Sequence, residues 1–422
     1  MVLSNKKIAI VGGGPGGLTL ARLLQLKGVE IKVYDRDLNK EARVQGATLD
    51  LHKKSGLLAL KKADLLNEFK ANYLPKAGIF RALDKNGNIC VDTHHDNNQK
   101  FSNKKFKPEI DRGPLRNILL SSLKPDTVVW DSNFVSMTKV ENVWHLNFKN
   151  GTMATADIVI GADGANSKIR PYLTSIKPIY TGITMLEGTV YDYMNTAPLF
   201  GNIIKEGKVF AYGDRKMMLI GAKGDGSLQF YTSCYTDENW TDISGINFKN
   251  KVEVIEWFKK EFSEWGDSWL ELFENAEPFF LPRPQYCYPF NQSWEAQSDI
   301  TILGDAAHLM PPFAGEGVNM AMLDALELSE ALTNNTFTNT KDAIASFEKQ
   351  MNVRFSKVGE LTIFNTKWMH QPNALSIIKS MFSKNFVKAI PFIFKLVLNV
   401  YIQPYIQRTL NIDSNKKTLI QN

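Results

Sequence analysis

The stretch IAIVGGGPGGLTLARLLQLKGVEIKVYD, residues 8–35, decides the fold. Its pattern predicts an apolar strand over 8–11, a glycine-rich turn, an apolar-periodic helix over about 18–26 and a second strand over 31–34. The turn carries Gly12-x-Gly14-x-x-Gly17, and Asp35 ends the second strand. Strand, turn, helix and strand in this order predict the start of a βαβ unit.

Each glycine of this turn has a specific physical use. Gly12 permits the tight turn, Gly14 lets the backbone approach a pyrophosphate, and Gly17 allows the helix to pack closely on the strand. Asp35 is then placed to accept hydrogen bonds from a ribose, and Arg36 lies either against the adenine or in solvent. A merely structural glycine turn is the alternative, but the combined pattern favours dinucleotide binding. It does not separate FAD from NAD(P).

Composition bounds the remaining possibilities. At 422 residues and 47.6 kDa the chain exceeds what one core usually supports, so we expect two domains. With 44% hydrophobic and 22% charged residues, it is neither disordered nor fibrous. Three widely separated cysteines, Cys90, Cys234 and Cys287, predict no metal site and no disulfide framework, and favour a cytoplasmic setting.

Charge and hydropathy exclude further classes of protein. The net charge of +6 is concentrated from Lys367 onward, and no base-reading module is present, so we expect no nucleic-acid partner. The apolar run over 390–402 is interrupted by Lys395 and Asn399, so we expect no membrane-spanning helix. The basic C-terminal stretch predicts helices that bridge the two domains, with a membrane-surface role as the alternative.

Two later segments share the strand-then-glycine character, DIVIGADG at 157–164 and ITILGD at 300–305, the latter followed by a helix pattern over about 317–332. We expect an α/β fold with a discontinuous, Rossmann-like dinucleotide-binding domain over 1–75, 106–176 and 287–360. Short alternating runs over about 179–235 predict an inserted antiparallel sheet. That second domain is assigned to 76–105 and 177–286, and the bridging or capping helices to 361–422.

The sequence resembles a known family at this point. IVIGADGANSKIR (158–170) and ILGDAAHLMPPFAGEGVNMAMLDALEL (302–328) resemble two motifs of the class A flavoprotein monooxygenases. EARVQGATLDLH (41–52) and EIDRGPLRNILLSSL (109–123) extend the resemblance to tetracycline-inactivating monooxygenases, up to about residue 360. The resemblance implies FAD as cofactor and NADPH as a transiently held co-substrate, since the chain has no second dinucleotide fingerprint.

The resemblance also implies roles for single residues. Asp305 would hydrogen-bond the FAD ribityl chain, Asp50 and Arg116 would contact the cofactor, and Arg43 would serve the approach of NADPH. Asp163 belongs to the first motif, where an ordinary strand-ending turn is the alternative. The backbone of the second motif would face the flavin ring from a helix N-terminus. Its residues are Pro312, Gly315, Gly317, Val318 and Asn319.

The expected substrate wall differs from that of the tetracycline-inactivating relatives. Glu187, Lys208 and Gln229 stand where those relatives carry a glutamine, an arginine and a histidine, and lysine lacks the planar fork of arginine. Phe210 and Phe313 would supply apolar walls, with ordinary core packing as the alternative. We expect Arg112 to belong to a solvated helix stripe, and His52 and His308 to be structural.

The resemblance implies hydroxylation of an aromatic or polycyclic molecule, tetracycline among the candidates, by O2 through a flavin C4a-hydroperoxide. Such chemistry needs no protein nucleophile, so we assign no catalytic acid or base. A flavin-dependent reductase that does not activate oxygen is the alternative, because it would carry the same nucleotide-binding motifs in its sequence. We expect a monomer whose partners are the small-molecule substrate and O2.

Overall fold

The computed structural model describes residues 2–3, 5–41, 46–94, 101 and 106–382. Its centre is a five-stranded parallel sheet in the order β17-β11-β1-β2-β7. These strands are apolar and mostly buried, as a parallel sheet covered on both faces requires. Their bounds are β1 Ile8–Val11, β2 Ile31–Tyr34, β7 Val128–Val129, β11 Ile158–Gly161 and β17 Ile300–Ile302.

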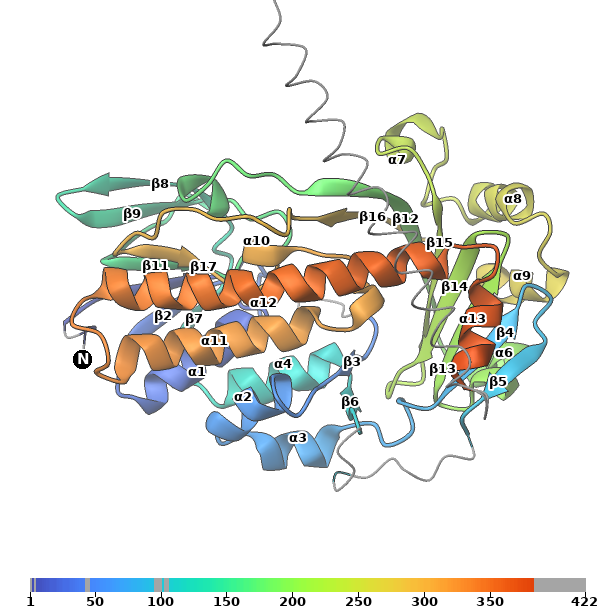
Figure 1. The fold of residues 1–422 in the computed structure, drawn as a ribbon, viewed down its shortest axis with the longest axis horizontal. Helices are drawn as coiled ribbons and strands as arrows, with labels where there is room; N and C mark the ends of the chain where they lie inside the picture. Colours follow the sequence, from blue (N-terminus) through green and yellow to red (C-terminus); the bar gives the residue numbers. More distant parts are fainter. Residues whose placement is uncertain (1, 4, 42–45, 95–100, 102–105, 383–422) are drawn as a thin grey trace, which may run out of the picture.

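Helices cover one face of this sheet and a small antiparallel sheet covers the other (Figure 1). The helical side holds α1 (Pro15–Leu26) and α11 (Gly317–Thr333), which pack against each other. The other side holds β8 (Phe134–Val140), β9 (Val143–Phe148) and β10 (Met153–Ala156). The predicted fold class is confirmed, since three separated stretches of chain build one Rossmann-like sheet.

The second domain is built on a seven-stranded sheet with the strand order β16-β12-β15-β14-β13-β4-β5. Its strands come from residues 80–92 and 179–287, close to the segments predicted for the inserted domain. All its pairs are antiparallel except β13 with β4. The bounds are β4 Phe80–Asp84, β5 Ile89–Asp92, β12 Ile179–Val190, β13 Lys208–Gly213, β14 Lys216–Ala222, β15 Leu228–Tyr235 and β16 Leu281–Cys287.

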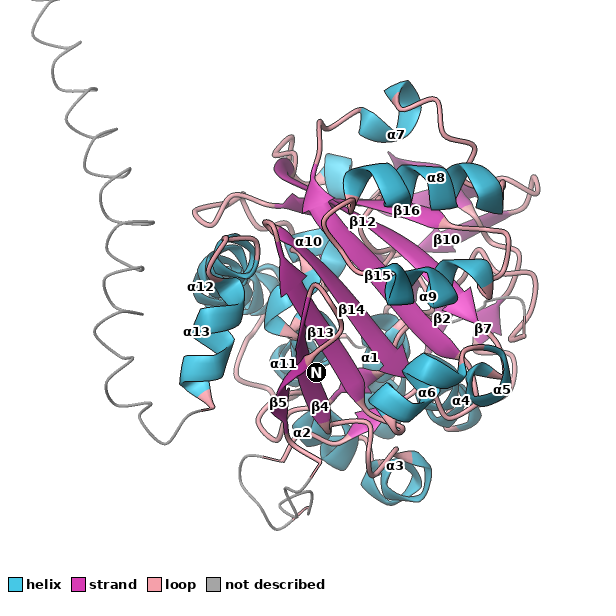
Figure 2. Ribbon diagram, turned by 90° about the vertical axis from the view of Figure 1, so that its right-hand side faces the viewer, coloured by secondary structure: helices cyan, strands magenta, loops and turns pink. Residues whose placement is uncertain are grey.

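Short helices close the outer face of this sheet, and Figure 2 shows α6, α8 and α9 in front of it. Buried side chains of the strands, such as Phe230, pack there against Phe258 and Phe273 in one apolar cluster. The opposite face is therefore the one that looks toward the rest of the protein. The helices are α5 Tyr193–Thr196, α6 Pro198–Ile204, α7 Trp240–Ile243, α8 Lys251–Glu261 and α9 Leu270–Glu274.

One long helix, α12 (Thr340–Met369), runs from the parallel sheet to the seven-stranded sheet (Figure 1). It is followed by α13 (Ala374–Met381), which packs on β13 and β4. The predicted boundary at residue 361 falls inside α12. No proline interrupts the chain between Pro312 and Pro372, so nothing in the backbone ends the helix there. The part of the predicted capping segment beyond residue 382 lies outside the described residues.

The remaining elements connect these layers. A two-stranded ribbon pairs β3 (Leu49–Asp50) with β6 (Glu109–Ile110) and places Asp50 opposite Glu109. No helix in the described ranges is long and apolar enough to cross a membrane. The other bounds are α2 Gly56–Lys62, α3 Leu66–Asn72, α4 Arg112–Ser121, α10 Asp305–His308, and the 3-10 turns Arg170–Tyr172, Asp267–Trp269 and Pro312–Ala314.

Candidate cofactor and substrate site

The glycine turn between β1 and α1 is as tight as its sequence predicts. Gly12 has φ +112°, and a Cβ on Gly17 would lie 2.1 Å from the carbonyl oxygen of Gly12. Only glycine therefore fits at these two positions. A Cβ on Gly14 would meet nothing within 4 Å, so the backbone at the start of α1 faces open space. That opening, beside the unpaired N–H groups of the first helical turn, fits a pyrophosphate.

Asp35 is held within the same turn. It is 2% exposed, and its carboxylate accepts hydrogen bonds from the N–H of Gly13 at 2.5 Å and of Asp37 at 2.9 Å. These bonds fix the carboxylate at the end of β2, where the glycine-turn pattern places the residue that accepts from a ribose hydroxyl. Arg36, beside it, is exposed.

Asp305 lies where the parallel sheet meets the N-terminus of α11. Its Oδ1 is 3.9 Å from the point where a Cβ on Gly317 would stand. The side chain of Asp305 is exposed, yet the surrounding protein raises its pKa by desolvation. Both observations hold for a side chain that lies deep in the protein and faces an opening between layers. A carboxylate in that position fits the hydroxyls of a ribityl chain.

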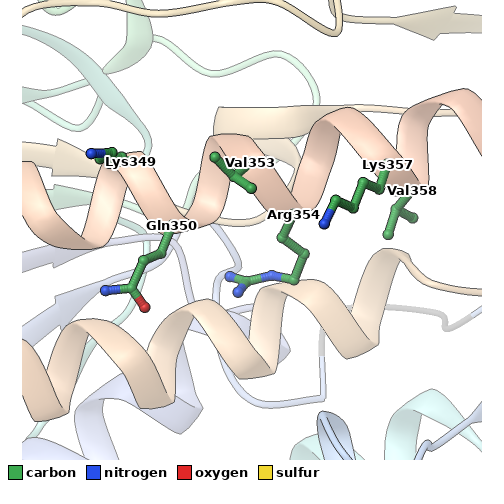
Figure 3. A pocket seen from close by; sticks show the side chains of 6 residues that line it. All are labelled: Lys349, Gln350, Val353, Arg354, Lys357 and Val358. Carbon is green, nitrogen blue, oxygen red and sulfur yellow. The ribbon is translucent and has the colours of Figure 1, made fainter.

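The turn that presents Asp305 is fixed from behind by a buried charge network. Gly304 has φ +62°, and its N–H donates to Asp324 Oδ2 at 3.0 Å. Asp324 also binds His308 Nε2 at 2.5 Å and Arg354 at 2.6 Å. Figure 3 shows Arg354 reaching from α12 toward α11, where it also pairs with Glu327 at 2.7 Å. The structure thus gives His308 the structural role expected for it.

Arg170 ties two motifs together, a role that the sequence did not indicate. Its guanidinium donates to the carbonyls of Ala306 and Ala307 at 3.1 and 2.8 Å, and to Gln292 at 2.8 Å. It also stacks on the ring of Tyr288 at 3.6 Å. Burial lowers its pKa to about 10. Arg170 ends the first motif, and Ala306 and Ala307 follow Asp305, so the arginine braces the Asp305 turn.

Asp163 caps its own loop. Its carboxylate accepts hydrogen bonds from Ser167 Oγ at 2.6 Å and from the N–H groups of Lys168 and Ile169 at 2.7 and 3.2 Å. Burial raises the pKa of Asp163, and these bonds oppose the rise. Gly164 follows with φ +81° and open space beside its Cα. The turn alternative therefore accounts for the Asp163 side chain, while the adjacent backbone can still face a cofactor.

The loop that leads into α11 has the backbone expected of a flavin-binding segment. Pro312 begins a 3-10 turn, Gly315 follows with φ +66°, and α11 starts at Gly317. Val318 lies in the first turn of α11, where N–H groups have no helical partner. The buried Asn319 side chain acts as a brace: it accepts the N–H of His52 at 2.8 Å and donates to the carbonyl of Asp50 at 2.8 Å.

Asp50 lies against this loop and shares a histidine with it. A Cβ on Gly315 would stand 3.3 Å from Asp50 Oδ1. His52 Nε2 is 2.9 Å from Asp50 Oδ2, and His52 Nδ1 is 3.1 Å from Glu316 Oε1. Burial lowers the pKa of His52, but the hydrogen bonds and charges of Asp50 and Glu316 outweigh it and raise the pKa to about 9.

This raised pKa predicts a pH-dependent contribution to stability. The folded-state pKa exceeds the ordinary value of 6.5, so the stabilisation is complete below about pH 6.5 and is lost as the pH rises through about 9. We expect His52→Gln to lower the free energy of unfolding by roughly 2 kcal/mol at pH 6 and by much less at pH 10. Urea unfolding of both proteins at the two pH values measures this, and an equal loss at both would contradict it.

The two arginines of α4 point to different places. Arg116, predicted to contact the cofactor, binds Asp37 at 2.8 Å and the carbonyl of Lys40 at 2.6 Å. It lines a surface cavity of about 490 Å³ beside Lys40 and Asn117. Arg112 donates to the carbonyl of Ala47 at 3.1 Å. Burial lowers its pKa, while the charges of Tyr231 and Asp305 oppose the change.

Arg112 is exposed, as expected of a solvated stripe, and it also stands beside the seven-stranded sheet: a Cβ on Gly46 would lie 3.8 Å from Arg112 Nε and 3.6 Å from Tyr231 Oη. The sequence pattern could not show this, since i and i+4 residues share one helix face. The predicted NADPH-contacting residue Arg43 lies outside the described residues.

The register of the seven-stranded sheet puts four predicted substrate residues on its inner face. Glu187 pairs with Tyr231, which pairs with Leu219 and through it with Phe210. Gln229 pairs with Gly221, which pairs with Lys208. Residues opposite one another in a sheet point to the same side. Glu187, Lys208, Phe210 and Gln229 therefore share the face that looks toward Asp305 and Arg112.

The polar residues of this wall are bound to other residues of the chain. Glu187 accepts a hydrogen bond from Gln229 Nε2 at 2.9 Å and forms an ion pair with Arg283. Gln229 is buried and also bonds Thr189 and the carbonyl of Gly188. Lys208 pairs with Glu109 at 2.6 Å. The sequence alone could not predict these pairs, because Arg283 is far from Glu187 along the chain and Glu109 is far from Lys208.

The two predicted aromatic wall residues have neighbours at the end of α12 and in α13. Phe210 meets Phe80 edge to face at 5.9 Å, and both border the cluster that holds Trp368 and Ile377. Phe313 meets the ring of the buried His370 at 5.4 Å. His370 Nε2 lies 2.8 Å from Ser233 Oγ, so it connects α12 to the inner face of the sheet. Burial lowers the pKa of His370 to about 4.

The open space at Gly14 yields a separable prediction. Gly14 has φ −78°, which alanine adopts freely, so Gly14→Ala should change stability by less than about 1 kcal/mol. The added methyl would occupy the space that fits the pyrophosphate and weaken FAD binding about tenfold. Fluorescence titration and thermal unfolding measure the two effects.

Gly28 is the matched control, since its Cβ would also meet nothing but its φ is +76°. Gly28→Ala should cost about 1–2 kcal/mol of stability and leave FAD binding unchanged. Equal FAD affinity in Gly14→Ala and the wild type would contradict the pyrophosphate assignment.

Among the described residues, no group of three or more His, Cys, Asp or Glu side chains could hold a metal ion. A surface groove of about 490 Å³ runs along α12, and Figure 3 shows its lining. The residues are Lys349, Gln350, Val353, Arg354, Lys357 and Val358.

Comparison with known proteins agrees with this geometry. A family model described as FAD binding domain matches residues 5–243 and 292–352. The monooxygenase asqM of Emericella nidulans is 29% identical over 380 residues, which cover 78% of this chain and 84% of that protein. Zeaxanthin epoxidase of Nicotiana plumbaginifolia is 28% identical over 84% of this chain and 53% of its own length.

Solved structures share the fold. Klebsiella pneumoniae HpxO complexed with FAD and uric acid superposes with a TM-score of 0.68 at 17% identity, over 93% of this chain and 92% of that one. The tetracycline destructase Tet(55) has a TM-score of 0.69 at 18% identity, over 87% and 90%. The three glycine-bearing segments, their order and the family match lead to one assignment. The chain belongs to the FAD binding domain family and is an enzyme of the FAD-dependent monooxygenase class.

Proposed function

We propose that the protein uses NAD(P)H and O2 to hydroxylate an aromatic or polycyclic small molecule between the Asp305 turn and the seven-stranded sheet. The single observation that carries this proposal is the convergence of Asp305, Arg112 and the start of α11 opposite the inner face of that sheet. When bound, FAD supplies the acceptance of hydride from NAD(P)H and the activation of O2.

The chain's own residues would hold the cofactor along its length. The opening at Gly14 fits the pyrophosphate, and Asp35 fits the adenosine ribose. Asp305 would bind the ribityl chain, and Arg112 would stand on the side of the flavin that faces the substrate wall. The N–H groups of Gly317 and Val318 would face the flavin ring. Arg116, which binds Asp37, would act through that loop.

The residues of the substrate wall favour a substrate with few charged groups. Glu187, Lys208 and Gln229 already have partners within the chain, and breaking a partly buried ion pair costs binding free energy. Phe210, Leu219 and Tyr231 lie side by side on this face, and their apolar and aromatic side chains suit a planar ring system. Tetracycline, a polycycle and the substrate class of the destructases that share this fold, is a candidate to test within this class.

Isotope labelling tests the proposal. NADPH and NADH oxidation should be followed with and without tetracycline and a panel of less polar polycyclic phenols, under 18O2. The proposal predicts that at least one compound accelerates oxidation and gains one labelled oxygen atom. Accelerated oxidation that leaves every compound without label would support a reductase instead and overturn the proposal. Labelling of other polycycles but not of tetracycline would remove only the antibiotic as substrate.

A further inference from the structure

His52 stands between two carboxylates at the entry of α11. Asp50 comes from β3 and Glu316 is the residue before the first turn of α11, and each faces one nitrogen of the imidazole ring, at 2.9 and 3.1 Å. A neutral imidazole has one donor nitrogen and one acceptor nitrogen, so it satisfies only one carboxylate. The doubly protonated ring donates to both. The geometry therefore requires a cation at this point.

The charges around the ring are nearly balanced. Lys107 approaches Asp50 Oδ2 at 3.8 Å. Glu109 stands opposite Asp50 in the β3–β6 ribbon and is paired with Lys208 of β13 at 2.6 Å. Glu109 and Lys208 thus compensate each other. Without a charge on His52, Asp50 and Glu316 would leave excess negative charge beside Gly315 and Gly317.

That location matters because the N-terminus of α11 carries the positive end of the helix dipole. Asp50 Oδ1 lies 3.3 Å from the position of a Cβ on Gly315, so its charge acts directly on this backbone. Uncompensated carboxylates here would oppose the field of the free N–H groups. FAD gains negative charge on its ring when it is reduced. The positive field of the free N–H groups would therefore favour the reduced cofactor.

We propose that His52 is a positioning residue that clamps Asp50 and Glu316 and keeps the entry of α11 electropositive, and thereby favours binding of reduced over oxidised FAD. This inference rests on the proposed placement of the flavin ring at α11. His52 touches neither the substrate nor the reacting atoms, and it acts through the two carboxylates. The pKa of His52, raised by them to about 9, agrees with a charged ring at neutral pH.

Charge compensation makes a prediction that a merely structural brace does not. His52→Gln removes one positive charge, Glu316→Gln removes one negative charge, and the double variant restores the wild-type sum. The affinity ratio of reduced to oxidised FAD follows from the reduction potentials of bound and free FAD. We expect this ratio to fall about tenfold in His52→Gln, to rise about tenfold in Glu316→Gln and to lie near the wild-type value in the double variant.

His94→Gln is the matched control, because His94 contacts Asp92 at 2.8 Å at the far edge of the seven-stranded sheet. It should leave the ratio unchanged. A fall of the ratio in His52→Gln, Glu316→Gln and the double variant alike, or no recovery in the double variant, would overturn the inference. FAD binding and the proposed function would still stand. A wild-type chain that binds no FAD would overturn both.

Discussion

Arg170→Met is expected to lower the free energy of unfolding by about 2–3 kcal/mol, because several buried hydrogen-bond acceptors lose a charged donor. The guanidinium satisfies the carbonyls of Ala306 and Ala307 and the side chain of Gln292, and methionine can replace none of these bonds. Burial lowers the pKa of Arg170 to about 10, so the cost of desolvating its charge offsets part of what these bonds contribute. Urea unfolding of the cofactor-free protein measures the loss.

The same substitution should also weaken FAD binding, because the bonds to Ala306 and Ala307 hold the turn that presents Asp305. Arg215→Met is the matched control, since the exposed Arg215 stacks on Tyr235 at 5.3 Å without a buried network. Its cost should stay below about 1 kcal/mol. Similar small losses in the two variants would show that the brace between the motifs is not needed.

Asp305→Ala is expected to weaken FAD binding by about 100-fold or more, as the loss of charge-assisted hydrogen bonds to buried hydroxyls would do. Its effect on the stability of the cofactor-free protein should be small. Burial raises the pKa of Asp305 above the ordinary value of 3.8, so its charged form is unfavourable in the folded state. The stability linked to this group is present below about pH 4 and is lost as the pH rises.

Because Asp305 is exposed, solvent weakens this effect, and at pH 7 the cofactor-free Asp305→Ala protein should be about as stable as the wild type. Fluorescence titration gives the FAD affinity, and thermal unfolding at pH 4 and pH 7 gives the stability. Asp237→Ala, in an exposed position after β15, is the control and should change neither. Loss of stability together with loss of FAD binding would instead make Asp305 a structural residue.

The local parts of the fold could be predicted from the sequence because short-range patterns determine them. Strands β1 and β2 have the predicted bounds, and α11 differs from its prediction by one residue at its end. Gly12 and Gly17 were identifiable because no other residue fits such close backbone contacts. Hydrophobic periodicity and glycine positions act over a few residues, and a single sequence displays them directly.

Contacts between distant segments could not be read in this way. Arg112 and Arg116 share one helix face, yet one reaches Ala47 and the other Asp37, and only the path of the intervening loop decides between them. The pairing of Glu187 with Arg283 and of Lys208 with Glu109 depends on strand register across two domains. Arg170 belongs to a quoted motif, but its brace to Ala306 needs the motifs to meet in space. Such pairs appear only after folding.

Direct titration of the purified, cofactor-free chain with FAD tests the central claim. Binding should quench the fluorescence of the flavin and shift its visible absorbance. The account predicts saturation at one FAD per chain, with affinity lost in Asp305→Ala and reduced in Gly14→Ala. A chain that is folded but leaves the FAD spectrum unchanged at every concentration would contradict it.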